Sequence, residues 1–413
     1  MHNSILMTLV LPNSIKNEVE EEVREMHLLA NTLSYDIVED IYQNAYKIDS
    51  STFFGKGKIQ EVLDKIDVLS IDTVFINNEL SPSHYKNIQK IFTKKIYVID
   101  RTKLILDIFK THARTSESKK QIRLAMLEYL LPRLVGRWTH LASQIGGTGI
   151  RGGPGEKQVE IDRRLARNEI TKLKKELVKI QKQRDTQRKN RDNIFKVSLV
   201  GYTNSGKSTL LRTLSGYNAF VKDQLFATLD TTTKKINLSN KSTVLVSDTV
   251  GFLRNLPHKL IASFRSTLSD IENSNLIVKV IDINASDIEG HITTINNTLK
   301  QLGCEKKNSI MVFNKIDLVE DDSKFVSINK KYKGSILISA FKNIRIQTLI
   351  NEFENYATKG LYEYELKIPY QHISIINDIY ENMIVQKRKD GYKFITFNVK
   401  ASKQAFNKVK SLL

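Results

Sequence analysis

The chain of 413 residues is poor in the residues that stabilise small secreted domains or build metal clusters. Its one cysteine, Cys304, excludes an intramolecular disulfide and a cysteine-based metal cluster. Its eight histidines form no pair at zinc-ligand spacing. No apolar run approaches the length of a membrane-spanning helix, and the opening stretch ILMTLVLP lacks the basic start of a signal peptide. We therefore expect a reduced, cytoplasmic protein without a membrane span.

Positive charge is what the chain has in excess. It carries 64 Lys and Arg against 45 Asp and Glu, a formal charge of +19, and 40% of its residues are hydrophobic. Such a balance indicates a globular protein with a polyanionic partner, which is RNA, DNA or an acidic membrane face. A generally basic composition, rich in Lys and Asn, is the alternative explanation, so charge alone does not identify the partner.

The pattern of apolar residues predicts a multidomain α/β protein with four segments. Residues 1–110 alternate strands such as DTVFI and KIYVID with helical patterns, which indicates a small α/β domain. Residues 111–193 read as two long helices around a glycine-rich loop, 145–156. The rhythm of residues 194–358 predicts a doubly wound, mostly parallel sheet. Residues 359–413 predict a small α+β domain whose hairpin turns at Asp390-Gly391.

The second long helix is the most charged part of the chain. Residues 163–191 contain twelve Lys and Arg against three acidic residues, and Ile170, Leu173, Leu177 and Ile180 form a narrow apolar seam for one neighbouring helix. A solvated helix face explains this pattern, and so does a basic hairpin whose glycine-rich tip reaches into RNA. The candidate RNA contacts are Gly146, Gly147, Gly149, Arg151, Lys172, Lys174, Lys175 and Lys179.

A phosphate-binding motif follows a predicted buried strand. GYTNSGKST, residues 201–209, matches G-x-x-x-x-G-K-[ST] and comes directly after FKVSLV. Backbone N–H groups from Asn204 to Ser208 would cradle phosphates at a helix N-terminus, and the Lys207 ammonium would reach the β- and γ-phosphates. The candidate nucleotide contacts in this motif are Gly201, Tyr202, Thr203, Asn204, Ser205, Gly206, Lys207, Ser208 and Thr209.

A second motif places a carboxylate and a glycine after another strand. In VLVSDTVGF, Asp248 and Gly251 form D-x-x-G. Asp248 would hold a Mg²⁺ ion through water, with Ser208 as a direct ligand, while the Gly251 N–H would meet the γ-phosphate. An ordinary strand-to-loop turn explains this sequence in isolation but is a poor explanation after a phosphate-binding loop.

Two further motifs predict guanine as the base. In MVFNKIDL, Asp317 would accept hydrogen bonds from N1–H and N2–H₂ of guanine, a pattern that adenine does not offer. Lys315 would lie over the base plane, and Asn314 would tie this loop to the phosphate loop. LISAFKN would place the Ala340 N–H against guanine O6, with Ser339 and Phe341 beside it. Four motifs in this order predict a GTPase.

The residue after the D-x-x-G glycine is Phe252, where many GTPases carry the glutamine that orients the attacking water. An apolar ring cannot polarise water, so we expect Phe252 to pack beneath the loop or point away from the nucleotide. In some GTPases that resemble this chain in having an apolar residue here, an asparagine at the position of Asn204 helps to hold K⁺. The alternative is that Asn204 only shapes the loop. The catalytic candidates are therefore Lys207, Gly251 and Asn204.

Nearly end to end, the chain resembles the HflX family of translational GTPases. Besides the nucleotide motifs, the supporting stretches are FFGKGKIQEV, DRTKLILDIFKTHARTSESKKQIRLAMLEYLLPRLVG, GGPGEKQVEIDRR and DQLFATLDTTTKKI. The last resembles the family's switch I, which implies that Thr228 coordinates Mg²⁺ and acts in catalysis and that Phe226 belongs to the nucleotide site. The family usually has proline where this chain has Thr231, and Thr231 or Thr232 is a second candidate for the ligand.

The resemblance also implies partners. It implies GTP and GDP as ligands and binding to the large ribosomal subunit, with loop 145–156 near the peptidyl-transferase region and the basic hairpin along rRNA. Family members are linked to splitting of stalled or stress-inactivated ribosomes. We expect a monomer.

Other functions fit the same residues. An assembly factor for the large subunit would use the same motifs and the same basic hairpin. An RNA-binding or RNA-remodelling protein with vestigial nucleotide hydrolysis is a further alternative, although the intact motifs oppose it. The stretch GKGK at 55–58 suggests a second nucleotide site, but it lacks the spacing of a phosphate loop, and a basic turn that opens a helix or contacts RNA explains it better.

Overall fold

A computed structural model describes the chain at residues 2–92, 96–134, 156–189, 194–216, 226, 230–239, 242–254 and 265–413. The chain divides into two compact units. The first contains residues 1–182, 222–230 and 253–267, and the second contains residues 183–221, 231–252 and 268–413. The sequence predicts one sheet domain at residues 194–358. Two stretches of it, 222–230 and 253–267, belong to the first unit. Within the described ranges, no helix is both long and apolar enough to cross a membrane.

The first unit begins with a four-stranded parallel sheet in the order β2-β1-β3-β4. Its strands are β1 (His2–Val10), β2 (Tyr35–Asn44), β3 (Thr73–Ile76) and β4 (Tyr97–Asp100). Parallel strands need crossover connections, and these contain α1 (Lys16–Thr32), α2 (Lys56–Val68) and α3 (Pro82–Ile91). The GKGK stretch opens α2, with Gly55 as its N-cap residue, and Lys58 forms an ion pair with Glu61 at 2.6 Å.

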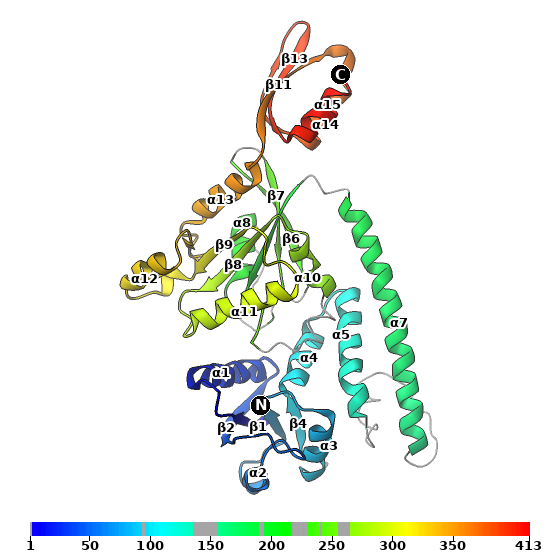
Figure 1. Ribbon diagram of the computed structural model, residues 1–413, viewed down its shortest axis with the longest axis vertical. Helices are drawn as coiled ribbons and strands as arrows, with labels where there is room; N and C mark the ends of the chain where they lie inside the picture. Colours follow the sequence, from blue (N-terminus) through cyan, green and yellow to red (C-terminus); the bar gives the residue numbers. More distant parts are fainter. Residues whose placement is uncertain are drawn as a thin grey trace. The chain divides into compact units, whose positions relative to one another are not determined.

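Helices follow the sheet along the chain. They are α4 (Arg101–His112), α5 (Ser116–Leu130), the short 3₁₀ helix η1 (Leu131–Arg133) and α7 (Glu156–Lys189). Figure 1 shows α7 beside α5. The predicted apolar seam of α7 supplies this contact, because Leu173 is buried together with Leu124 and Leu127 of α5, and Ile170 and Leu177 pack against them. Ion pairs flank the seam, and Arg123 of α5 holds both carboxylate oxygens of Glu169.

Phe226 and Asp230, which precede β6 in the chain, make contacts within the first unit. The ring of Phe226 meets the ring of Phe109 edge to face, with their centroids 4.6 Å apart, and Phe226 is buried. The carboxylate of Asp230 accepts a hydrogen bond from the Thr115 hydroxyl at 2.6 Å and another from the Arg114 N–H at 3.0 Å. This carboxylate therefore satisfies donors at the start of α5.

The second unit contains a six-stranded sheet in the order β10-β9-β8-β5-β7-β6. Its strands are β5 (Phe195–Gly201), β6 (Thr232–Asn237), β7 (Thr243–Asp248), β8 (Leu276–Asp282), β9 (Ser309–Asn314) and β10 (Ile336–Leu337). All neighbours are parallel except β6, which runs antiparallel to β7. The prediction of a multidomain α/β fold with a mostly parallel sheet is confirmed.

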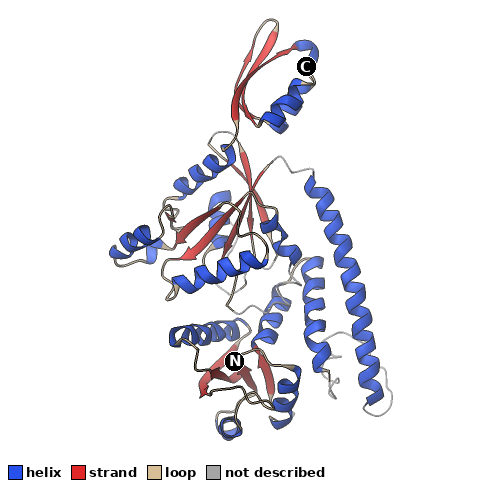
Figure 2. Cartoon of the chain, viewed as in Figure 1, coloured by secondary structure: helices blue, strands red, loops and turns tan. Residues whose placement is uncertain are grey.

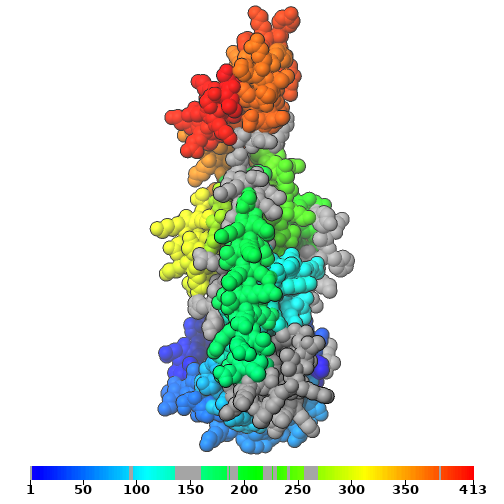
Figure 3. Space-filling model, turned by 90° about the vertical axis from the view of Figure 1, so that its right-hand side faces the viewer, coloured from blue at the N-terminus to red at the C-terminus, as the bar shows by residue number. Residues whose placement is uncertain are grey.

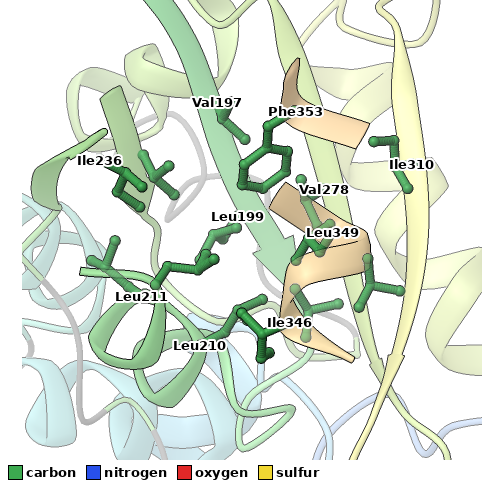
Figure 4. Close-up of a cluster of buried hydrophobic side chains, with 14 of the residues drawn as sticks. Val197, Leu199, Leu210, Leu211, Ile236, Val278, Ile310, Ile346, Leu349 and Phe353 are labelled. Carbon is green, nitrogen blue, oxygen red and sulfur yellow. The ribbon is translucent and has the colours of Figure 1, made fainter. Parts of the chain in front are cut away.

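Helices connect and cover these strands. They are α8 (Lys207–Ser215), α10 (Arg265–Glu272), α11 (Ile288–Gln301), α12 (Ser323–Lys331) and α13 (Ile346–Thr358), with a 3₁₀ turn η2 (Ile316–Leu318). Figure 4 shows the core formed where aliphatic residues of β5 and β8, such as Leu199 and Val278, meet Leu210 of α8 and Phe353 of α13. Each of these four side chains is fully buried, so the core fixes the strand ends from which the loops depart.

The C-terminal part is a small antiparallel sheet covered by helices on one side (Figure 2). Its elements are β11 (Tyr362–Pro369), η3 (Tyr370–His372), α14 (Ile375–Asn382), β12 (Ile384–Asp390), β13 (Phe394–Ala401) and α15 (Lys403–Lys410). The strand order is β11-β13-β12, and the hairpin between β12 and β13 turns after Asp390.

Candidate nucleotide-binding site

The phosphate loop connects the central strand β5 with α8. The strand ends at Gly201 and the helix begins at Lys207. Gly206 has a φ of +89°, and a Cβ at this position would lie 2.2 Å from Asn314 Nδ2, so only glycine fits. The loop and the helix N-terminus therefore stand at the carboxyl edge of a parallel sheet. In open α/β sheets, ligands bind at this edge, and a helix N-terminus favours anions there.

Lys207 lies beneath the loop and contacts it directly. Its Nζ donates to the carbonyl oxygens of Gly201 at 3.1 Å and Tyr202 at 2.8 Å, and the residue is 6% exposed. Burial lowers the pKa of this ammonium to about 8, and the nearby Asp248 carboxylate opposes the shift. The group thus remains mostly protonated at neutral pH. A bound phosphate would raise its pKa, because an opposite charge favours the ammonium form.

Ser208 and Asp248 form the candidate magnesium site. The Ser208 hydroxyl donates to Asp248 Oδ2 at 2.5 Å, and Asp248 is buried at the end of β7. The described residues contain no group of three or more His, Cys, Asp or Glu side chains that could hold a metal. One hydroxyl and one carboxylate nevertheless fit Mg²⁺, because this ion binds through few protein oxygens and completes its shell with water and substrate phosphates.

The D-x-x-G segment is joined to the phosphate loop by its backbone. The Thr203 N–H donates to the carbonyl of Phe252 at 2.9 Å, and the Phe252 N–H donates to the carbonyl of Gly201 at 3.0 Å. A Cβ at Gly251 would lie 2.8 Å from Thr203 Cγ2, so this close approach requires glycine. The Phe252 ring is 2% exposed and therefore packs inside the unit instead of facing a water molecule.

Phe252→Ala is expected to reduce stability more than chemistry. Removing a buried phenyl ring costs roughly 3 kcal/mol of unfolding free energy, whereas the two backbone hydrogen bonds of the bridge do not depend on the side chain. The variant should unfold at lower denaturant concentration, while single-turnover GTP hydrolysis at low temperature changes less than about tenfold. Phe252→Leu is the matched control with a smaller cavity. Normal stability with a collapsed rate would contradict the packing role.

Asn314 links three loops at the edge of the sheet. It ends β9, its Nδ2 donates to the carbonyl of Ser205 in the phosphate loop at 2.9 Å, and its Oδ1 accepts the Ala340 N–H at 2.9 Å. The Ala340 N–H was expected to face guanine O6. Asn314 already accepts this hydrogen, so a contact with the base, which stays a prediction, would have to share it.

The neighbouring Lys315 and Asp317 are the candidate residues for recognition of the base. Lys315 adopts a φ of +67°, and its Nζ forms an ion pair with Asp282 Oδ2 at 2.8 Å. Asp317 lies in η2, where its Oδ1 is shielded from solvent and accepts no hydrogen bond from the described residues. An unsatisfied buried acceptor is costly. A ligand that presents N–H groups would remove this cost.

The other residues predicted for the nucleotide site differ in their burial and contacts. Ser339 is buried and its hydroxyl accepts the Lys342 N–H at 3.0 Å, whereas Phe341 is 70% exposed. Phe226 belongs to the first unit, where its ring contacts Phe109. Thr232 begins β6 after Thr231. Thr228 and the loop residues Gly146, Gly147, Gly149 and Arg151 lie outside the described residues.

The lysines of α7 divide into two kinds. Figure 3 shows side chains of α7, in green, at the surface along the helix. Lys172, Lys175 and Lys179 are exposed. Lys174 differs, because its Nζ forms an ion pair with Glu128 of α5 at 2.8 Å. Lys174 thus helps to join α7 to α5, a role that the sequence analysis did not predict.

The sequence analysis also did not predict two contacts of Lys315, in the loop that follows β9. Asp282 ends β8 and pairs with Lys315, and the amide of Asn284 donates to the Lys315 carbonyl at 3.1 Å. The position of Asp282 in the sequence could have predicted its contact with Lys315. The carboxyl ends of neighbouring parallel strands lie at the same edge of a sheet, and Asp282 ends one such strand. The Tyr202 ring stacks on His291 with centroids 3.8 Å apart, and no sequence pattern pointed to this pair.

Comparison with known proteins agrees with this geometry. Residues 20–110 match the family model "GTP-binding GTPase N-terminal", residues 112–191 match "GTP-binding GTPase Middle Region", and residues 196–315 match "50S ribosome-binding GTPase". GTPase HflX of Magnetococcus marinus is 35% identical over 399 residues, which cover 96% of this chain and 91% of that protein. The chain belongs to the HflX family of GTPases.

Further HflX relatives and solved structures match as well. HflX of Flavobacterium psychrophilum is 44% identical over 76% of this chain and 75% of that protein, and HflX of Escherichia coli is 34% identical over 89% and 86%. A GTP-binding protein from Sulfolobus solfataricus, solved with GDP, is 25% identical with a TM-score of 0.43, covering 87% of this chain and 99% of that one. The predicted family and the GTPase activity are confirmed.

Proposed function

We propose that this HflX-family GTPase binds the large ribosomal subunit and uses GTP hydrolysis to GDP and phosphate to separate the subunits of stalled or inactive ribosomes. The match of residues 196–315 to a 50S ribosome-binding GTPase model supports the ribosomal partner. The shielded Asp317 carboxylate oxygen supports guanine as the base. We propose further that the protein acts as a monomer in the cytoplasm.

Recognition of guanine would rest on Asp317. Its Oδ1 would accept N–H donors from the base and so gain the partner that it does not find among the described residues. Lys315 would lie over the base plane, with its ammonium held by Asp282 at 2.8 Å. The Asn314 amide would keep this loop in register with the phosphate loop through Ser205.

The phosphates would be held at the opposite end of the site. N–H groups of the phosphate loop would surround them, the Lys207 ammonium would stabilise charge on the β- and γ-phosphates, and the Gly251 N–H would contact the γ-phosphate. Ser208 and Asp248, with Thr228 as a further ligand, would bind Mg²⁺, which neutralises phosphate charge when present. Contacts of the γ-phosphate with Thr228 and Gly251 would order the switch segments, and hydrolysis would release them.

We expect hydrolysis to be faster in K⁺ than in Na⁺ at equal ionic strength. Phe252 supplies no charge, and Asn204 is exposed on the phosphate loop with a φ of +57°. Its side-chain oxygen would help to hold a cation beside the phosphates. The expected difference is about tenfold, equivalent to ~1.4 kcal/mol of barrier. Asn204→Ala should abolish the difference while GDP affinity stays unchanged. Equal rates in the two salts would remove potassium from the account, and Asn204 would then only shape the loop.

The exposed lysines of α7 are expected to contact rRNA. Reversing charge at Lys172, Lys175 and Lys179 should weaken binding to large subunits and make its salt dependence shallower, by about 2 to 3 in the log–log slope, because each lost phosphate contact removes roughly 0.9. Affinity for GTP should not change. The measurement is co-sedimentation with large subunits across a salt series.

The control for this experiment reverses as many exposed charges away from α7, at Lys306, Lys330 and Lys333. Lys174 stays intact in both variants, because its ion pair with Glu128 supports the hairpin. Equal binding by the α7 variant and the wild type at every salt concentration would contradict the RNA contact.

Light scattering of intact ribosomes tests the proposed function. Added protein with a non-hydrolysable GTP analogue should lower the scattered intensity as subunits separate, and protein with GDP should have little effect. Binding to immature large subunits, with no effect on intact ribosomes, would favour the assembly factor instead.

A further inference from the structure

The C-terminal sheet has one covered face and one exposed face. Along β13, Ile395, Phe397 and Val399 are buried and pack with residues of α14 and α15. The residues that alternate with them, such as Phe394 and Asn398, are exposed. Figure 2 shows both helices on the same side of the strands. Among the described residues, this second face of the sheet is therefore the one open to solvent.

Uncompensated positive charge gathers along the β12 edge of this face. Lys387 lies opposite Asn398 and Lys389 lies opposite Thr396, so both share the exposed face. Neither they nor Lys393, at the turn, form an ion pair with any described residue. The β11 edge of the same face differs, because its carboxylates compensate the lysines there: Lys400 pairs with Glu363 at 3.2 Å and Lys367 with Glu365 at 3.3 Å.

Aromatic rings stand at the tip of the same hairpin. Tyr392 is 98% exposed and Phe394 is 44% exposed. The turn that carries them is braced, since the Tyr370 hydroxyl donates to the carbonyl of Gly391 at 2.7 Å and the Gly391 N–H donates to the carbonyl of Phe394 at 2.9 Å. The rings are thus presented to solvent from a fixed hairpin.

Protection of an edge strand does not explain the whole arrangement. β12 lies at the edge of its sheet, and lysines on an edge strand prevent pairing with another chain. That function accounts for Lys387 and Lys389 but not for the rings, because exposed aromatic side chains promote association. Lysines beside exposed rings are instead the combination that binds unpaired nucleotides.

We infer that this hairpin face, defined as Lys387, Lys389, Tyr392, Lys393 and Phe394, binds a single-stranded stretch of RNA. The lysines contact phosphates, and the rings stack on bases that are not paired. A duplex offers the phosphates but keeps its bases stacked inside, so it does not use the rings. The inference rests on the proposed function in one respect: the RNA would be an unpaired region of ribosomal RNA.

Binding of the full-length protein to two labelled RNAs, followed by fluorescence anisotropy, tests this inference. The probes are a mixed-sequence single strand of twelve nucleotides and a duplex of the same length. Replacing Tyr392 and Phe394 by alanine should weaken single-strand binding about fivefold or more per stacked base and leave duplex binding unchanged. Replacing Lys387 and Lys389 by glutamate should weaken both and make the single-strand salt slope shallower by about 1.4.

The matched control reverses two exposed lysines of α15, Lys403 and Lys408, in the helical layer of the same domain. Equal losses in the two charge variants, or no loss in the aromatic variant, would overturn the inference. Tighter binding of a polyglutamate peptide than of RNA would overturn it too, in favour of an acidic protein partner.

The same variants separate this inference from the proposed function. Wild-type RNA binding by the hairpin variants, with normal stimulation of GTP hydrolysis by large subunits, overturns the inference alone. Hairpin-dependent RNA binding in a protein that large subunits neither bind nor stimulate supports the inference and contradicts the proposed function.

Discussion

Asp317→Asn is expected to lower the affinity for GTP by at least about 100-fold, because a site built to accept two N–H groups would then present a competing amide donor. The shielded Oδ1 makes the effect large, since water does not replace the lost contact. Xanthosine triphosphate carries an oxygen in place of the 2-amino group. The variant should therefore bind it better than the wild type does. Competition against a fluorescent nucleotide measures both affinities.

Asp321→Asn is the control for this substitution. Asp321 is exposed and close in sequence, and its carboxylate accepts hydrogen bonds from the N–H and the hydroxyl of Ser323. Its replacement should leave both affinities within about twofold. If Asp317→Asn binds GTP like the wild type, Asp317 does not read the base, and the assignment of η2 to the nucleotide site is wrong.

Lys207→Ala is expected to slow single-turnover hydrolysis by about 100- to 1000-fold, the usual effect of removing one group that stabilises transition-state charge. The ammonium lies inside the loop, and a Cβ at Gly251 would be only 3.2 Å from its Nζ. The substitution also leaves the carbonyls of Gly201 and Tyr202 without this donor. Some loss of stability should therefore accompany the loss of rate.

Lys207→Met separates the two effects, because it retains most of the buried volume without the charge. Both variants should lose hydrolysis equally, whereas methionine should restore part of the stability. Thermal unfolding and single-turnover rates are the two measurements. A rate near that of the wild type in the methionine variant would contradict the electrostatic role of Lys207.

Local patterns predicted the sheet of the second unit well. The phosphate loop, the D-x-x-G motif and the NKID loop each follow a buried strand, so each motif fixed one end of β5, β7 or β9. Apolar spacing also predicted the seam of α7, because Leu173 and its neighbours meet a single helix. The spacing of apolar residues predicts such a helix contact well, because these residues form the one face of the helix that is buried.

Contacts between distant residues were not predictable in the same way. Asp230 and Arg114, which precedes α5, are 116 residues apart, and the ring of Phe226 contacts Phe109 in the first unit. The Ala340 N–H was assigned to guanine, but the Asn314 amide competes for it. Lys174 was likewise predicted to contact RNA, whereas in the structure its ammonium forms an ion pair with Glu128 of α5. One amino-acid sequence by itself contains no pattern that predicts contacts between residues so far apart.

GTP turnover measured with and without large ribosomal subunits tests the central claim most directly. The protein alone should turn over slowly, because Phe252 supplies no water-orienting group and its ring is buried. Purified large subunits should accelerate turnover at least about tenfold, and small subunits should not. Turnover that is fast without ribosomes, or unchanged by large subunits at saturating concentration, would contradict the account.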